Sequence, residues 1–252
     1  MTGKLTLIGC GPGATDLLTL RAVQRIAAAD MLLYDRLVEP DLLCHASPHA
    51  ECVYVGKGCR DGGRQQDDIN LRLKTALEAG KHVARLKSGD PMVFGRAAEE
   101  LAVAIALDVE IEIVPGVTAA LAAASDALIT VTERAELQSF VVTTARAAKQ
   151  DEEPDWADLV KPGVCAAFYM GVAQAWRIQS NLMAAGLPGH VPADWIENAG
   201  RETMRAIPSQ LDRLALDAKQ HSVSNPAILL VRYPLSLAQA SRKPATEALA
   251  AF

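Results

Sequence analysis

The stretch KLTLIGCGPGATDLLTL (residues 4–20) connects an apolar, strand-like run to a leucine-rich run through a loop that contains three glycines. Gly9, Gly11 and Ala14 satisfy the G-x-G-x-x-G/A pattern of a nucleotide-binding turn between a strand and a helix. Asp16 is predicted to cap the helix, which would run through residue 30. This pattern indicates either a ligand-binding turn or a tight strand-to-helix connection without a ligand.

The residues around this loop bear on whether it holds a dinucleotide. Asp35 lies about twenty positions further on, at the end of the second predicted strand, where dinucleotide-binding folds place an acid for the ribose. Pro12, however, has no N–H to donate to a pyrophosphate. Asp16 places a carboxylate at the predicted helix start, where a phosphate would otherwise bind. We therefore expect the loop to receive an uncharged or cationic group, with an NAD-dependent oxidoreductase as the less favoured alternative.

Composition and charge argue against several classes of protein. The chain has 252 residues, half of them hydrophobic and 22% charged, as in a globular protein of one large or two modest domains. Its net charge of −5, without a basic block, argues against a nucleic-acid or anionic-membrane partner. We find no long apolar run and no signal-peptide core, and expect a cytoplasmic protein. The five cysteines form no C-x-x-C pair and the histidines show no ligand spacing, which predicts free thiols and no metal site.

Strand-like and helix-like runs alternate through the first half of the chain, which predicts a mostly parallel sheet covered by helices on both faces. Gly80 is expected to cap the second helix, whose apolar face carries Ile69, Leu73, Ala76 and Leu77. The charged residues 96–100 (RAAEE) are expected to be the solvated start of the third helix. The predicted strands are residues 4–10, 31–35, 52–57, 82–86 and 109–114, and the predicted helices are residues 17–30, 67–80 and 96–108.

The sequence PGVT (residues 115–118) interrupts this alternation and predicts a domain junction. We expect an N-terminal α/β domain over residues 1–114 and a C-terminal α/β domain over residues 115–252, with a frayed tail from about residue 236. A ligand cleft between two such domains is common. In the second domain, strands are predicted at residues 139–145, 163–171, 194–198 and 227–233, and helices at residues 173–186 and 208–220.

Five motifs in order resemble one known family. LIGCGPGATDLLTLRA, DMLLYDRLV, YVGKG, RLKSGDPMVFGR and VPGVTAALAAA follow one another at the spacing found in uroporphyrinogen-III C-methyltransferases, and FYMG, WIENA and NPAILLV follow later. The chain is similar to these S-adenosylmethionine (SAM)-dependent tetrapyrrole methyltransferases from Lys4 to about Val231. The resemblance implies two α/β domains in the tetrapyrrole methylase (class III methyltransferase) architecture, and a homodimer. No fused dehydrogenase and chelatase domain, as found in some members, is expected.

The resemblance also implies a functional site. Asp35 resembles the family's proposed proton acceptor and Lys57 its proposed proton donor. Candidates to bind substrate carboxylates are Arg36, Lys87, Arg96 and Arg134, because guanidinium groups in particular match a carboxylate with two hydrogen bonds. The SAM site would be built largely from main-chain groups of Pro12, Ser88, Gly89, Asp90, Val93, Thr118, Ala119, Met170 and Ala199.

Some of these residues also have a purely structural interpretation. Asp35 could simply cap a turn at a strand end, and Asp90 before Pro91 is a good turn former without any ligand. Lys57 could be a solvated loop cation. Met170, after an apolar strand, is by default a core residue.

The chain departs from the family pattern at several positions, and the loss of two histidines changes the expected substrate side. Ser88 replaces the first of two glycines, and Ala199 replaces a glycine. Glu133 stands where the family has a histidine, and Ala145 ends a Thr-Thr-Ala sequence where the family has Thr-Gly-His. An added carboxylate would repel an octacarboxylate porphyrinogen.

The leading hypothesis is a SAM-dependent C-methyltransferase that converts uroporphyrinogen III to precorrin-2 by methylating two ring carbons, for sirohaem or cobalamin biosynthesis. The alternatives are a relative that acts on another precorrin, and a paralogue that binds SAM or a tetrapyrrole without catalysis.

Overall fold

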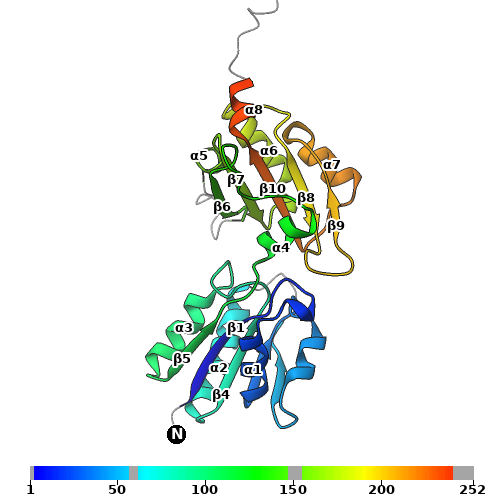
Figure 1. Cartoon of the computed structure of the whole chain (residues 1–252). Coiled ribbons are helices and arrows are strands. Elements are labelled where there is room, and N and C mark those ends of the chain that lie inside the picture. The colour runs from blue at the N-terminus through cyan, green and yellow to red at the C-terminus, as the bar shows by residue number, and fades with distance from the viewer. Residues whose placement is uncertain (1–2, 57–61, 147–154, 241–252) are drawn as a thin grey trace, which may run out of the picture. The chain divides into compact units, whose positions relative to one another are not determined.

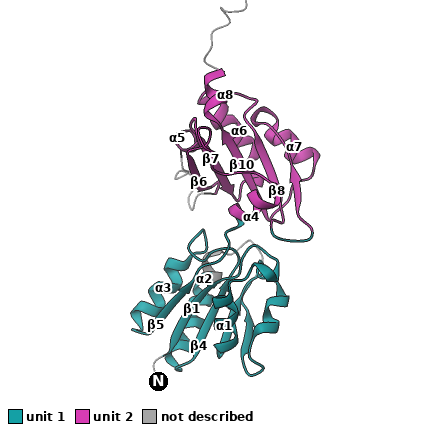
Figure 2. Ribbon diagram, in the orientation of Figure 1, with its two compact units in different colours: residues 1–119, 200–202 teal, residues 120–199, 203–252 magenta. Residues whose placement is uncertain are grey.

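The computed structural model describes residues 3–56, 62–146 and 155–240 of the chain (Figure 1). It divides into two compact units (Figure 2). Unit 1 consists of Met1–Ala119 and Gly200–Glu202, and unit 2 consists of Ala120–Ala199 and Thr203–Phe252. In the described part of the chain, no helix has the length and apolar character that crossing a membrane requires.

The sheet of unit 1 has five strands in the order β3-β2-β4-β1-β5, and every pair of neighbours is parallel. The predicted parallel sheet is confirmed. In the register of the sheet, Gly9 at the end of β1 lies beside Lys87 at the end of β4. The strands are β1 (Lys4–Gly9), β2 (Met31–Tyr34), β3 (Glu51–Tyr54), β4 (His82–Lys87) and β5 (Glu110–Val114).

Helices cover both faces of this sheet because its strands are apolar on both sides. Along β1, Leu7 belongs to the hydrophobic cluster under α2 and α3, and the next residue, Ile8, belongs to the cluster under α1 and η2. This alternation follows from the two-residue repeat of a strand. The helical elements are η1 (Thr15–Leu17), α1 (Leu20–Ala28), η2 (Pro40–His45), α2 (Gly62–Glu78) and α3 (Ala97–Ala106).

Helix α2 follows its sequence prediction closely. Ile69, Leu73, Ala76 and Leu77 are all buried. Gly80 has a φ of +78°, and its N–H donates to the Leu77 carbonyl at 3.0 Å. A left-handed glycine closes a helix in this way without steric cost. The predicted apolar face and the predicted glycine cap are therefore confirmed.

The predicted cap of the first helix is wrong. Asp16 lies within the short turn η1, and α1 begins only at Leu20, where the Thr19 hydroxyl accepts a hydrogen bond from the Ala22 N–H at 3.1 Å. The backbone of Leu18 is extended (ψ 141°), and this separates the turn from the helix. Thr19 therefore takes the capping role that was expected of Asp16, and it satisfies the Ala22 N–H.

Unit 2 contains a mixed sheet in the order β6-β7-β10-β8-β9, in which only β6 and β7 are parallel. The sequence missed β9, because a strand of three residues has too short a pattern. The strands are β6 (Ser139–Thr144), β7 (Val164–Tyr169), β8 (Ala193–Glu197), β9 (Arg205–Ile207) and β10 (Ala227–Tyr233). The helical elements are α4 (Ala119–Asp126), α5 (Trp156–Leu159), η3 (Val172–Gln174), α6 (Ala175–Ala184), η4 (Leu211–Arg213), α7 (Leu214–Gln220) and α8 (Leu235–Ala240).

Aromatic side chains fill the core of unit 2. Trp156 on α5 meets Phe168 on β7 edge to face, with ring centroids 6.1 Å apart. Trp195 on β8 is fully buried in the same cluster, and its Nε1–H donates to the Leu214 carbonyl at 3.3 Å. These contacts fix α5 and α7 on one face of the sheet.

The prediction of a frayed tail does not hold for residues 236–240, because Leu235–Ala240 forms helix α8; the rest of the predicted tail, residues 241–252, lies outside the described residues. The N–H of Leu235 donates to the Glu136 carbonyl, and the hydroxyl of Ser236 donates to the Glu136 carboxylate at 2.8 Å. Ala238 is buried in the core cluster of unit 2. These contacts fix the segment that the sequence pattern alone could not place.

We predict that Trp195→Ala lowers the free energy of unfolding by about 3–5 kcal/mol, because it opens a cavity in the core of unit 2. Trp176→Ala is the matched control, since Trp176 is 69% exposed, and it should change the stability by no more than about 0.5 kcal/mol. Urea denaturation followed by far-ultraviolet circular dichroism measures both. Equal losses in the two variants would contradict this description of the core.

Candidate functional site

Most of the predicted site residues of unit 1 follow its parallel strands at one edge of the sheet. Because β1, β2, β4 and β5 run in the same direction, their carboxyl ends share this edge, which is where open α/β sheets bind ligands (Figure 1). Pro12 follows β1, Asp35 and Arg36 follow β2, Ser88, Gly89, Asp90, Val93 and Arg96 follow β4, and Thr118 and Ala119 follow β5.

Three of these loops are in main-chain contact. A Cβ atom on Gly116 would lie 2.3 Å from the Gly89 carbonyl oxygen, and one on Gly9 would lie 2.5 Å from the Gly116 nitrogen. No side chain fits at such distances, so the loops after β1, β4 and β5 meet backbone to backbone. Gly11 and Gly89 also form an isolated antiparallel bridge with N···O distances of 3.2 and 2.7 Å.

The first glycine loop is poorly built for a diphosphate. The N–H of Cys10 donates to the Lys87 carbonyl, that of Gly11 to Gly89, and that of Ala14 to Gly200. Pro12 has no N–H. A dinucleotide-binding turn directs such N–H groups at the pyrophosphate and places a helix start directly behind them. Here the three N–H groups already have partners, and helix α1 begins only at Leu20.

Asp90 joins two of the loops. Its Oδ1 accepts a hydrogen bond from the Met92 N–H at 2.8 Å, and its Oδ2 accepts one from the Gly116 N–H at 3.0 Å. The turn-forming interpretation of Asp90 describes the first contact, and the second ties the loop after β4 to the loop after β5. Asp90 therefore shapes the edge of the sheet through main-chain groups.

A cluster of four charged side chains lies beneath this edge. Arg85 on β4 bonds to two carboxylates at once, because its Nη2 lies 3.0 Å from Asp35 Oδ2 and its Nε lies 3.0 Å from Glu100 Oε1. Lys87 Nζ lies 2.7 Å from Glu100 Oε2 and donates to the Gly95 carbonyl at 2.6 Å. Arg85, Lys87 and Glu100 are all buried, whereas the Asp35 side chain is 29% exposed.

Burial and neighbouring charges act against each other on the two cations. Burial lowers the pKa of Lys87, and the positive charge of Arg85 adds to that effect. Burial also acts to lower the pKa of Arg85, but Glu100 and Asp35 outweigh it, so that the pKa of Arg85 is raised. The pKa values of the two buried cations are therefore shifted in opposite directions.

Two residues of this cluster are buried, although the sequence analysis expected one to meet substrate and the other to meet solvent. Lys87 was a candidate to bind substrate carboxylates, but it is buried and already paired with Glu100. Residues 96–100 were expected to be a solvated helix start, but Glu100 is fully buried, while Glu99 is half-exposed. The reason is that α3 turns Glu100 toward β4, where Arg85 and Lys87 require a buried counter-charge.

The other candidate arginines of unit 1 remain near the surface. Arg96 forms a two-pronged ion pair with Glu99, at 2.7 and 2.6 Å. Arg36 is exposed, and within the described residues it takes part in no salt bridge. Lys57, the predicted proton donor, lies outside the described residues.

The candidates in unit 2 divide between opposite edges of its sheet. Met170 and Ala199 follow β7 and β8, which run in the same direction, so both lie at the carboxyl edge of these strands. Met170 has a φ of +59° and is 41% exposed, which differs from the expected core residue. Arg134 belongs to a turn closed by the Glu133–Leu137 bridge, just before β6, at the amino edge. Unit 2 therefore does not bring Arg134 to Met170 and Ala199, and both Arg134 and Glu133 are exposed.

The sequence pattern missed Arg201, which ties two loops of unit 1 together. Its Nε donates to the Pro12 carbonyl at 3.3 Å, its Nη2 donates to the Leu37 carbonyl at 3.1 Å, and its guanidinium pairs with Glu39. No local signal marks Arg201, because its partners are far away in the sequence. Arg85, by contrast, carried a signal: an arginine inside an apolar strand needs a buried partner.

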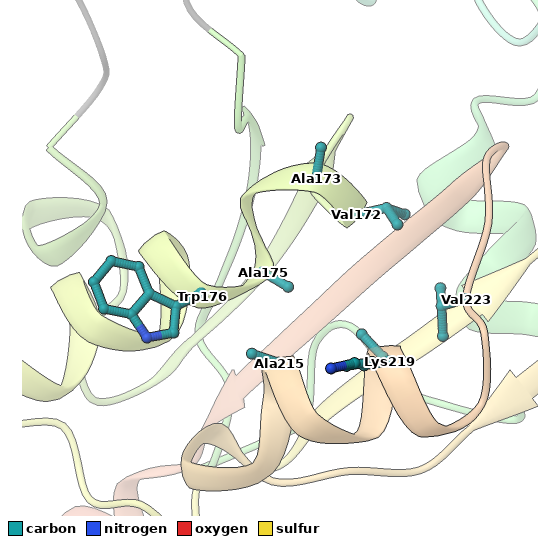
Figure 3. Close-up of a pocket in the computed structure, with 8 residues that line it drawn as sticks. Val172, Ala173, Ala175, Trp176, Ala215, Lys219 and Val223 are labelled. Carbon is teal, nitrogen blue, oxygen red and sulfur yellow. The ribbon is translucent and has the colours of Figure 1, made fainter.

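Two surface grooves lie elsewhere. Figure 3 shows one of about 310 Å³ in unit 2, between the start of α6 and α7, with Trp176 and Lys219 at its border. The other, of about 420 Å³, lies in unit 1 between β3 and α2. None of the described residues that line either groove is a predicted site residue, so the carboxyl edge of the unit 1 sheet remains the candidate site. In the described residues no cluster of His, Cys, Asp or Glu could hold a metal ion.

The fold and this edge define an α/β protein with a parallel and a mixed sheet, whose candidate ligand site is lined by main chain. The chain belongs to the tetrapyrrole (corrin/porphyrin) methylase family, whose sequence profile matches residues 4–215. It is 38% identical to siroheme synthase 2 of Yersinia enterocolitica, over 93% of this chain and 49% of that protein. The chain spans about half the length of the curated relatives it matches.

Solved structures agree with this assignment. A cobalt precorrin-4 methyltransferase superposes with a TM-score of 0.81 at 26% identity, covering 91% of this chain and 95% of that one. The uroporphyrin-III C-methyltransferase of Thermus thermophilus in complex with S-adenosyl homocysteine gives a TM-score of 0.76 at 32% identity, covering 91% and 92%. The predicted family and architecture are confirmed.

We predict that Gly116→Ala destabilises the protein by about 1–3 kcal/mol, because its Cβ would force apart the loops after β4 and β5. Gly171→Ala is the matched control, since the nearest atom to its Cβ would lie at 3.4 Å, an ordinary contact. Thermal unfolding of both variants measures the difference. An unchanged midpoint for Gly116→Ala would show that the loops do not meet at this position.

Proposed function

We propose that this protein is a SAM-dependent C-methyltransferase that methylates uroporphyrinogen III at two ring carbons to give precorrin-2. Family membership supports a methyltransferase of tetrapyrroles. The names of two groups of relatives, siroheme synthases and uroporphyrin-III C-methyltransferases, support this substrate. A homodimer stays a prediction from the resemblance, and a cytoplasmic location stays a prediction from the sequence.

The observation that carries the proposal is the main-chain lining of the carboxyl edge in unit 1. A Cβ built on Gly89 would meet nothing closer than the Ala119 nitrogen at 3.7 Å and the Thr118 Cα at 3.9 Å. The space beside Gly89 is thus bordered by main chain and small side chains. SAM has a sulfonium, an ammonium and a carboxylate but no phosphate, so a lining of carbonyl groups and small residues fits it.

The residues proposed to hold SAM have distinct tasks. Pro12, Gly89, Thr118 and Ala119 would offer main-chain contacts, and Asp90 fixes the loops that carry them through its bonds to Met92 and Gly116. The neighbouring Ser88 and Val93 would contribute from the loop after β4, while Met170 and Ala199 of unit 2 stay predictions from the resemblance. When bound, SAM supplies a methyl group on a positively charged sulfur, and the protein contributes mainly by positioning the substrate carbon.

Asp35 is the proposed proton acceptor: transfer of the methyl group from the SAM sulfonium leaves the ring system with one added positive charge, so a proton must leave the ring system afterwards. Its Oδ1 accepts a hydrogen bond from the Leu37 N–H at 3.1 Å, and its Oδ2 faces Arg85. The side chain is nevertheless 29% exposed, so a ligand can approach it. Lys57 is proposed as the proton donor on the basis of the resemblance.

Substrate carboxylates are proposed to bind Arg36 and Arg96. Both follow strands of unit 1 at the carboxyl edge, and both are exposed. Arg96 would exchange its pairing with Glu99 for a substrate carboxylate. The other two candidates, Lys87, which is buried, and Arg134, which lies at the amino edge of the unit 2 sheet, stay predictions.

A second candidate is a methyltransferase of the same family that acts on another precorrin. The structure of the cobalt precorrin-4 methyltransferase superposes with a higher TM-score, 0.81, than that of the uroporphyrin-III enzyme, 0.76. The exposed Glu133, where the related family has histidine, also favours a different substrate. A non-catalytic SAM-binding paralogue is the third outcome of the assays below.

Titration calorimetry should show that the protein binds SAM and does not bind NAD, because the N–H groups of Cys10, Gly11 and Ala14 already have partners. Asp35→Asn should bind SAM as the wild type does. Heat of binding with NAD and none with SAM would favour the hypothesis of an NAD-dependent oxidoreductase.

Incubation with enzymatically generated uroporphyrinogen III and SAM should give a product with two added methyl groups by mass spectrometry. Asp35→Asn should lower kcat by about 10²–10⁴-fold, because it removes the proposed base. Product formed only from a later precorrin would favour the second candidate. Tight SAM binding without any methylated product would favour the non-catalytic paralogue.

A further inference from the structure

Every nitrogen of the Arg85 guanidinium has a hydrogen-bond partner, and the group connects the buried Glu100 to the partly exposed Asp35. Arg85 lies beside Leu33 in the register of β4 and β2, and its Nη1 donates to the Leu33 carbonyl at 3.3 Å and to the Leu86 carbonyl at 2.7 Å. Its Nε and Nη2 bond to Glu100 and Asp35, each at 3.0 Å. A planar group with partners on every nitrogen has little freedom to rotate.

Solvent exposure increases along the series of charged side chains Glu100, Arg85 and Asp35. Glu100 is fully buried, the Arg85 side chain is 4% exposed, and Asp35 is 29% exposed. Asp35 is therefore the member of the cluster that a ligand can reach most easily. Its other oxygen, Oδ1, is held by the Leu37 N–H, so that both oxygens have a fixed donor.

Stability alone is a weak explanation for this cluster. Taking two ions out of water is costly, and replacing a buried ion pair by apolar residues of similar size often leaves the stability unchanged or raises it. Such a cluster makes more sense if its exposed end has a task that needs a defined orientation. A displacement of about 1 Å in a reacting group can lower a rate by about 100-fold.

We propose that Arg85 is the positioning residue of Asp35: anchored by Glu100, it holds the carboxylate in one orientation at the carboxyl edge of the unit 1 sheet. This inference rests on the proposed role of Asp35 as proton acceptor. Arg85 itself does not touch the substrate. Lys87 acts one step further away, by sharing the charge of Glu100.

A double-mutant cycle between Arg85 and Asp35 tests the proposal. Arg85→Lys keeps the charge but loses the fork, and should lower kcat by roughly 10- to 100-fold while the affinity for SAM stays within about twofold. In an Asp35→Asn background the same substitution should lower kcat no further, because a residue that acts only through Asp35 has nothing left to position.

Asp217→Asn is the matched control for lost stability. Asp217 is buried in unit 2 and paired with Arg213 at 2.8 Å, so the substitution breaks a partly buried ion pair without contacting a proposed site residue. It should lower the midpoint of urea unfolding and leave kcat unchanged at a temperature where the protein is folded. A merely structural role of Arg85 would make Arg85→Lys behave like this control.

If Arg85→Lys does not fold, the charge-balanced double variant Arg85→Gln with Glu100→Gln takes its place, with the same expected loss of kcat. Wild-type kcat in a folded Arg85 variant, or losses that multiply with those of Asp35→Asn, would overturn the inference and leave the proposed function standing. Wild-type kcat in Asp35→Asn would overturn the role of Asp35 and the inference together. A wild-type protein that forms no methylated product would overturn the proposed function, and the inference with it.

Discussion

The meeting of three main-chain segments at Gly9, Gly89 and Gly116 sets the geometry of the candidate site. These segments follow β1, β4 and β5, and the distances that a Cβ atom would have, 2.3 and 2.5 Å, leave no room for a side chain at Gly116 or Gly9. Since the three strands are parallel and adjacent, the loops that follow them lie close together. Glycine, which has no side chain, lets their main chains come into direct contact. The Asp90 carboxylate then joins two of the loops through the Gly116 N–H. Such a site offers main-chain groups to a ligand. Which ligands it can bind depends on which of its N–H groups already have hydrogen-bond partners.

Hydrogen bonding, more than sequence pattern, separates this site from that of a dinucleotide-binding protein. The glycine spacing of the first loop satisfies a nucleotide fingerprint, yet the N–H groups of Cys10, Gly11 and Ala14 are bonded to neighbouring carbonyls. Beneath the same edge, two buried cations and one buried anion end at the partly exposed Asp35. The interior of unit 1 thus gives the edge a fixed charge arrangement as well as a fixed shape.

Sequence reasoning succeeded where the cause of a structure is local. Apolar runs located the strands of unit 1, and the spacing of Ile69, Leu73 and Leu77 located the buried face of α2, because a strand or helix imposes its own repeat. It failed where the partner is distant. Glu100 is buried because it pairs with Arg85 on β4. Arg201 is held by Pro12 and Glu39. The residues next to Glu100 and Arg201 in the sequence reveal neither of these contacts. The wrong cap at Asp16 has a different cause: the extended backbone at Leu18 shifts the helix start to Leu20.

Unit 1 is built from two separate segments of the chain, and this limits how the protein can be cut into fragments. Its compact body includes Gly200–Glu202, so it is discontinuous in the chain, and no single cut can release it intact. A fragment that ends near residue 119 would lack Arg201 and leave the Pro12 and Leu37 carbonyls and the Glu39 carboxylate without this partner. Swapping the first half of this chain into a relative would therefore also require the short 200–202 segment, because Arg201 in that segment bonds to Pro12, Leu37 and Glu39 in the first half.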